Sequence, residues 1–139
     1  MVNENYKKNK MQFKYLADLK TELKKFTGFM TSDVISEPAS KSVALLSDLN
    51  LCLPIEDSSS PIVSAFSAIL HNRKSMKSWP PLIATMCSCI STEVITGDAL
   101  QTIVETMESV TNEIDYDSGL RIIQFVTSSV GNRFLEIPI

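Results

Sequence analysis

Residues 60–72 read SPIVSAFSAILHN, and residues 78–91 read SWPPLIATMCSCIS. In each stretch a serine precedes one or two prolines, an arrangement that suits the start of an α-helix, and apolar residues then recur at helical spacing. A cap followed by a one-sided apolar helix returns in residues 98–111 and 115–130. A helix with one apolar face must bury that face against neighbours. Four such segments in series predict an all-α fold built from stacked helices.

Two more helices are predicted upstream of this series, over residues 5–26 and 33–49. The first has a narrow apolar stripe with lysines on its other faces, which is typical of a helix that packs along a single partner. The buried face of the second is predicted to be Ala39, Val43, Leu46 and Leu49. Pro38 would kink a helix that begins at Asp33, whereas it fits the first turn of a helix that begins at Glu37.

Short breaks between helices of this length predict antiparallel hairpins. We therefore expect an armadillo/HEAT-like α-solenoid of about six helices in antiparallel pairs. Residues 1–131 are expected to form a single domain, followed by an irregular tail at 132–139. The longest break, residues 50–59, is predicted to be an exposed loop. The alternative is a compact bundle around one helix that is apolar on all sides, and no segment reads that way.

The composition is that of a folded protein, with 44% apolar residues in a chain of 139. No apolar run reaches the roughly 18 residues of a membrane-spanning helix, and residues 1–10 lack the apolar core of a signal peptide. Three cysteines without framework spacing favour a reducing compartment, so we expect a cytoplasmic protein. Cys87 and Cys89 are only two residues apart, but further metal ligands are lacking, and we expect no metal or cofactor.

Charge is distributed unevenly along the chain. Seven of the 13 basic residues fall between Lys7 and Lys25, and none lies between Lys77 and Arg121. The molecule should therefore have a basic end and an acidic end. These are either two solvated helix faces or, at the basic end, a surface for an anionic membrane or an acidic partner.

No catalytic constellation is evident, and we expect a protein that is not an enzyme. The single histidine, His71, stands at a predicted helix end without a nucleophile motif. Glu105 and Glu108 share a helix face, but a paired-carboxylate site needs a second element. Neither a recognised nucleic-acid motif nor a phosphate-binding loop is present, so nucleic acid and small-molecule substrates are not expected.

Six segments resemble, in order, a known family. They are YLADLKTEL (15–23), ASKSVALL (39–46), PIVSAF (61–66), LIATMCSCIS (82–91), the helix at 99–110, and DSGLRIIQ (117–124). This order resembles the N-terminal dimerisation and cyclophilin-binding (DCB) domain of the large Arf guanine-nucleotide exchange factors, and more closely that of their Golgi relative, the Mon-two scaffold. The chain departs from the family at residues 50–59 and at Trp79-Pro80-Pro81.

The resemblance implies an armadillo-like solenoid without enzymatic activity. It implies a protein-interaction and dimerisation module of a Golgi or endosomal trafficking scaffold, with peripheral recruitment to Golgi or trans-Golgi membranes. The implied partners are an Arf-like small GTPase and a second copy of the chain. A compact helical-bundle adaptor with no trafficking role remains the alternative function.

Two sets of candidate binding residues follow. A loop-borne charged cluster beside a large aromatic is typical of interface anchors, which suggests a partner surface at Arg73, Lys74, Lys77 and Trp79. The alternative places Trp79 in the core with the cations merely solvated.

A self-association surface is predicted along the first helix at Phe13, Leu16, Leu19, Leu23 and Phe26. If that helix instead belongs to the core, removing it would unfold the chain.

Overall fold

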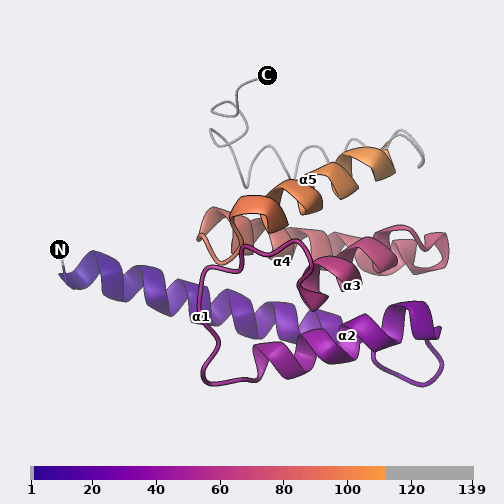
Figure 1. Cartoon of the computed structure of the whole chain (residues 1–139), viewed down its shortest axis with the longest axis horizontal. Helices are drawn as coiled ribbons and strands as arrows, with labels where there is room; N and C mark the ends of the chain where they lie inside the picture. Colours follow the sequence, from indigo (N-terminus) through magenta and orange to yellow (C-terminus); the bar gives the residue numbers. More distant parts are fainter. Residues whose placement is uncertain (1, 112–139) are drawn as a thin grey trace.

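The computed structural model describes residues 2–111, and within them the chain is all-α, as predicted. Its elements are α1 (Val2–Lys24), α2 (Asp33–Leu46), α3 (Pro61–Leu70), a 3₁₀ turn η1 (Arg73–Ser78), α4 (Trp79–Ser91) and α5 (Gly97–Thr111) (Figure 1). The predicted sixth helix at 115–130 and the tail at 132–139 lie outside the described residues.

The helices pack in layers. α1 lies against both α2 and α4, α2 lies against α3, and α3 lies against α5. η1 turns the chain back so that α4 runs opposite to α3 (Figure 1). The indole N–H of Trp79 fixes this reversal because it donates a 3.0 Å hydrogen bond to the carbonyl of Ile69. The first turn of α4 is thereby tied to the last turn of α3.

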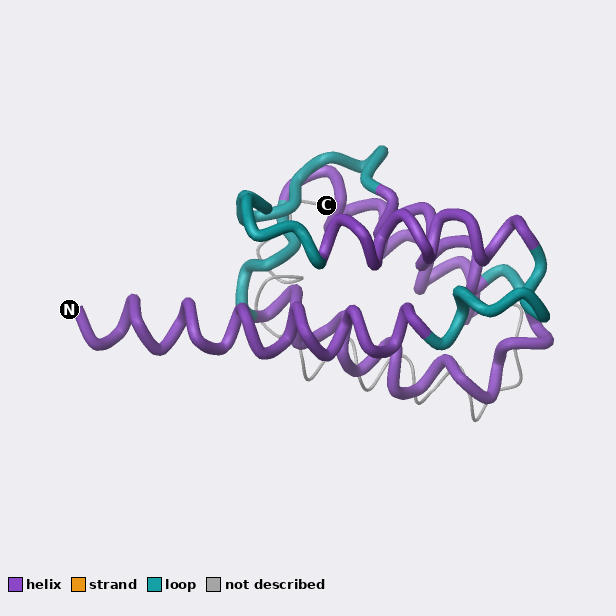
Figure 2. The backbone as a smooth tube through the Cα atoms, turned by 90° about the horizontal axis from the view of Figure 1, so that it is seen from below, coloured by secondary structure: helices purple, strands orange, loops and turns teal. Residues whose placement is uncertain are grey.

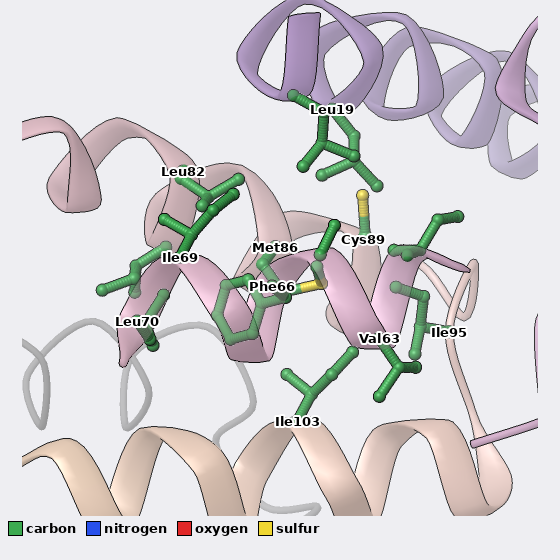
Figure 3. Packing of buried hydrophobic residues seen from close by; sticks show 14 of the residues in the cluster. Leu19, Val63, Phe66, Ile69, Leu70, Leu82, Met86, Cys89, Ile95 and Ile103 are labelled. Carbon is green, nitrogen blue, oxygen red and sulfur yellow. The ribbon is translucent and has the colours of Figure 1, made fainter. Parts of the chain in front are cut away.

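The core includes buried side chains of α3 and α4 that lie between α1 on one side and α5 on the other (Figure 3). The predicted apolar faces of α3 and α4 are confirmed. The buried residues of those faces are Ile62, Ala65, Phe66, Ile69 and Leu70 of α3, and Trp79, Leu82, Ile83, Met86, Cys87 and Ile90 of α4. In α5, Ile103, Met107 and Val110 are buried as expected. Helical spacing alone was sufficient to predict these buried residues of α3, α4 and α5, because each of these helices has one continuous apolar stripe.

α3 differs from the sequence-based expectation. No segment reads as apolar on all sides, so no helix was expected to lie at the centre of the fold. In Pro61–Leu70 only Ser64 is exposed, since α2, α5 and η1 contact the helix from different sides. Its serines and alanines are small enough for neighbouring backbones to approach it. α3 therefore has the position of a central helix, which the sequence pattern did not indicate.

The predicted face of α2 is confirmed only in part: Ala39 is buried, Val43 and Leu46 are partly buried against the core, and the prediction for Leu49 is wrong. The helix begins at Asp33 with Pro38 in its interior and ends at Leu46, so Leu49 lies beyond it and is fully exposed. Ile35, Ala39 and Ser42 are the buried residues, a stripe rotated from the predicted one. The hydroxyl of Ser42 donates to the carbonyl of Pro38, 2.8 Å away, and is thus satisfied inside the core.

The break at 50–59 is more ordered than predicted. Ile55 is buried and forms a parallel bridge with Ile95. The N–H of Ile55 donates to the carbonyl of Val94 (2.8 Å), and the N–H of Thr96 donates to the carbonyl of Ile55 (3.0 Å). Two loops that are 40 residues apart in sequence are thus joined by backbone hydrogen bonds, which hold the connection against the α4–α5 turn.

Candidate protein-binding groove

An open groove of about 530 Å³ runs between α1 and the chain that follows α2. α1 contributes one wall through Phe13, Leu16 and Ala17. The opposite wall is the segment from Leu46 to Leu53, with leucines at 46, 49, 51 and 53. Apolar side chains therefore face the groove from both walls.

The second wall is shaped by a turn at the end of α2. Beyond Leu46, the carboxylate Oδ1 of Asp48 accepts the N–H of Asn50 at 2.9 Å, and the Asp48 carbonyl accepts the N–H of Leu51 at 3.2 Å. Asp and Asn favour such turns because their side chains bond to nearby backbone. The turn directs Leu49 into solvent, and the Ile55 bridge holds the far end of the segment.

The first wall belongs to the part of α1 where packing on the body begins. Gln12 donates to the carbonyl of Thr92 at 2.9 Å, and Leu16 is the first buried residue of α1 from Asn9 onward. Upstream of this point α1 extends beyond the other helices, as Figures 1 and 2 both show. Phe13 stands at the junction with 68% of its side chain exposed.

The chemistry of the groove is that of an interface. Its lining combines apolar side chains with one cation, Lys20, and one carboxylate, Asp48, and with the uncharged polar residues Asn9, Gln12 and Ser47. Exposed Phe13 and Leu49 give it an uncovered apolar surface, the feature that distinguishes interaction sites from ordinary surface. An apolar centre with a polar rim is also the anatomy of protein–protein interfaces. The arrangement can accept apolar side chains of a partner.

The stripe predicted for self-association is divided by the structure. Leu16, Leu19, Leu23 and Phe26 are buried in the core of this chain, where α1 packs on α4 and α2, whereas Phe13 is exposed. Four of the five side chains are therefore core residues and are not available to a second copy. The narrow stripe fits a helix that packs along neighbours of its own chain as well as it fits a dimer, so the sequence could not distinguish them.

The four residues predicted as a partner surface do not form one cluster. Trp79 is buried, and its N–H is engaged with α3, so it cannot anchor a partner. Arg73, Lys74 and Lys77 are exposed on η1. The aromatic and the cations are adjacent in sequence but face the core and the solvent respectively.

The cysteine and histidine side chains have structural surroundings. Burial raises the pKa of Cys89 to about 12, with smaller contributions from Asp18 and Cys87, so its thiol stays protonated at neutral pH. The Nδ1–H of His71 donates to the carbonyl of Ser67, 2.6 Å away, at the end of α3. Within residues 2–111 no three Cys, His, Asp or Glu side chains are grouped as a metal ion requires.

The groove was missed at the sequence level because Leu46 and Leu49 of its second wall were assigned to the buried face of a helix, and residues 50–53 were assigned to an exposed loop. A signal was present: leucine recurs at alternate positions through Leu49, Leu51 and Leu53, followed by Ile55. Alternation of this kind indicates an extended segment with one apolar side. It could have identified the segment as part of a surface, although not the helix that it faces.

Comparison with known proteins identifies no relative, since no family model, curated protein or solved structure matches this chain. In the described part of the chain, no helix combines the length and hydropathy needed to cross a membrane.

Proposed function

We propose that this chain is a non-catalytic protein-interaction module that binds a partner protein in the groove between α1 and residues 46–53. The observation that carries the proposal is the exposure of Phe13 and Leu49, which lie on facing walls of a groove of about 530 Å³. Large apolar side chains are costly to leave in water, so a surface that holds them together gains from being covered.

The proposed setting is a Golgi or endosomal trafficking scaffold with an armadillo-like solenoid, and the proposed partner is an Arf-like small GTPase. This assignment rests on the order of helical segments that resembles the DCB domain. The contact between the alternate helices α3 and α5 supports the solenoid part of the proposal, because stacked helical pairs pack in this way. Self-association is the second proposed interaction, and it would have to use surface residues such as Phe13.

Phe13 is the best residue with which to test the site. An aromatic side chain in an interface centre often contributes 2 kcal/mol or more to binding, about thirtyfold in affinity. Because Phe13 is largely exposed, Phe13→Asp should leave the fold intact. Met11→Asp is a matched control: it introduces the same charge on the same helix, at a residue that is 46% exposed and does not line the groove.

The experiment is a binding assay with purified Arf and Arf-like GTPases, each loaded with GDP or with a non-hydrolysable GTP analogue. Retention of one Arf-like GTPase in its GTP form, reduced by Phe13→Asp and not by Met11→Asp, is the expected result. Equal binding by both variants would exclude the groove. Absence of any GTPase binding by a folded, helical chain would remove the trafficking assignment.

A compact helical-bundle adaptor is the second candidate, and the central position of α3 favours it. Such an adaptor would use the same groove for a partner outside the Arf family. The GTPase panel separates the two candidates because only the trafficking scaffold predicts nucleotide-dependent binding.

A further inference from the structure

A second exposed apolar surface lies in the turn between α1 and α2. The N–H of Thr31 donates to the carbonyl of Gly28 at 3.0 Å, which closes a four-residue turn with Phe29 and Met30 at its two central positions. Their side chains are 96% and 88% exposed, and that of Val34 in the next turn is 76% exposed. Turn centres usually carry Gly, Asn, Asp or Pro, so two large apolar residues there are unusual.

Local packing holds this turn in place. Before it, Phe26 is buried and closes the end of α1 through a 3.0 Å hydrogen bond from its N–H to the Leu23 carbonyl. After it, the Ser32 carbonyl accepts the N–H groups of Ile35 and Ser36, which starts α2. Phe29 and Met30 are thus presented at the apex by ordered chain on both sides.

Basic residues surround the apex. A hollow of about 410 Å³ joins Val34 of α2 to Arg73 and Lys74 of η1. In Figure 1 the α1–α2 turn and η1 lie at the same end of the molecule, away from the N-terminus. The exposed cations of this end are Lys24, Lys25, Arg73, Lys74 and Lys77.

The acidic groups near the apex are fewer than the basic ones. Glu22 is paired with Lys25 at 3.0 Å, and Asp33 stands at the first position of α2. The apex end therefore has more cations than carboxylates in a chain whose net charge is −3, and α1, with exposed Lys10 and Lys14, is a second basic region. An anionic surface would attract the apex end as well as α1, and the exposed apolar side chains of the apex distinguish it as the contact.

We infer that the apex formed by Phe29, Met30 and Val34 is a membrane-contact site that inserts into the interface of an anionic lipid bilayer. Apolar side chains on a convex turn can enter the region between headgroups and acyl chains, while flanking cations meet the phosphates. A protein partner would need a surface of about 800 Å² per side, whereas three protruding side chains suffice for shallow insertion. The inference rests on this end of the molecule alone and does not depend on the proposed partner of the groove.

Co-flotation of the full chain with phosphatidylcholine vesicles tests the site, with or without about 30 mol% phosphatidylserine. Wild type should float with the anionic vesicles and be released by about 0.5 M salt, because the Debye length then falls to a few ångströms. Phe29→Ser with Met30→Ser should lower the partition coefficient about tenfold or more. Lys74→Ala with Lys77→Ala should lower it about 25-fold, or fivefold for each charge.

α1 supplies the controls, since it is also basic and also exposes a large apolar residue outside the groove, Met11. Met11→Ser, and separately Lys10→Ala with Lys14→Ala, should change flotation less than twofold. All variants are checked for unchanged helicity by circular dichroism.

Three results would overturn the inference. They are no flotation of wild type with anionic vesicles, equal flotation of wild type and the Phe29/Met30 variant, or a larger loss from the α1 variants than from the apex variants. The first result would leave the apex as a protein-contact surface. If no GTPase binds but the chain still floats with anionic vesicles, only the proposal for the groove fails. The two proposals can therefore be overturned independently.

Discussion

Replacing Leu19 by alanine distinguishes a core role for the α1 stripe from a role in self-association. Leu19 is fully buried, and in Figure 3 it points from α1 toward Cys89 of α4. The Cys89 thiol in turn contacts the carbonyl of Tyr15 at 3.6 Å, so α1 and α4 meet closely at this level. Leu19→Ala should leave a cavity that neither helix can readily close.

Burial of this side chain sets the size of the effect. Leu→Ala at fully buried positions destabilises by about 2–5 kcal/mol, through lost transfer free energy and the cavity that remains, and we expect about 3 kcal/mol here. Phe13→Ala, on the same helix but mostly exposed, should change the free energy of unfolding by less than about 0.5 kcal/mol.

Urea unfolding followed by circular dichroism measures both variants. With an m value of about 2 kcal/mol/M, Leu19→Ala should lower the unfolding midpoint by about 1.5 M. Light scattering on the same samples gives their mass. The core assignment is refuted if Leu19→Ala unfolds at the wild-type midpoint and instead reduces the mass of an oligomer.

Three further predictions concern single residues. Trp79→Phe should cost about 1–2 kcal/mol in urea unfolding, because it removes the 3.0 Å hydrogen bond to the Ile69 carbonyl, and an unchanged midpoint would contradict that role. Gly97→Ala should cost about 1 kcal/mol in the same assay, since Gly97 has a φ of +61° that alanine adopts only with strain; a stabilised variant would refute this. Burial raises the pKa of Cys89 to about 12, so the unfolded chain ionises this thiol at lower pH than the folded one does. The free energy of unfolding should therefore fall as pH rises from about 9 toward 12, and Cys89→Ala should show a smaller fall over that window.

The sequence predicted helices best where one apolar stripe leaves no choice of face. In α3 and α4 the stripe is continuous and prolines mark the start, so both the helices and their buried residues are confirmed. In α2, Ala39 belongs to both candidate stripes, and Ile35 and Ser42 compete with Val43 and Leu46 for the buried positions. Contact with α1 and α3 decides between the two stripes, and periodicity within one helix holds no information on that contact.

The candidate sites could be predicted less well because each joins distant segments. The groove needs Phe13 and Leu49 on facing walls, and the apex needs Val34 beside Lys74. The cations of η1 could be recognised from composition as a charged turn. Helical spacing placed Trp79 on the apolar face of α4, whereas its position beside a charged turn also suggested a partner anchor, and its burial with a hydrogen bond to the Ile69 carbonyl decides for the core.

Titration calorimetry with a GTP-loaded Arf-like GTPase tests the proposed function most directly, using wild type, Phe13→Asp and Met11→Asp. The account predicts that Met11→Asp binds like wild type and that Phe13→Asp binds about thirtyfold more weakly with unchanged helicity. Equal affinities for all three proteins, or wild-type affinity that does not depend on the bound nucleotide, would contradict it.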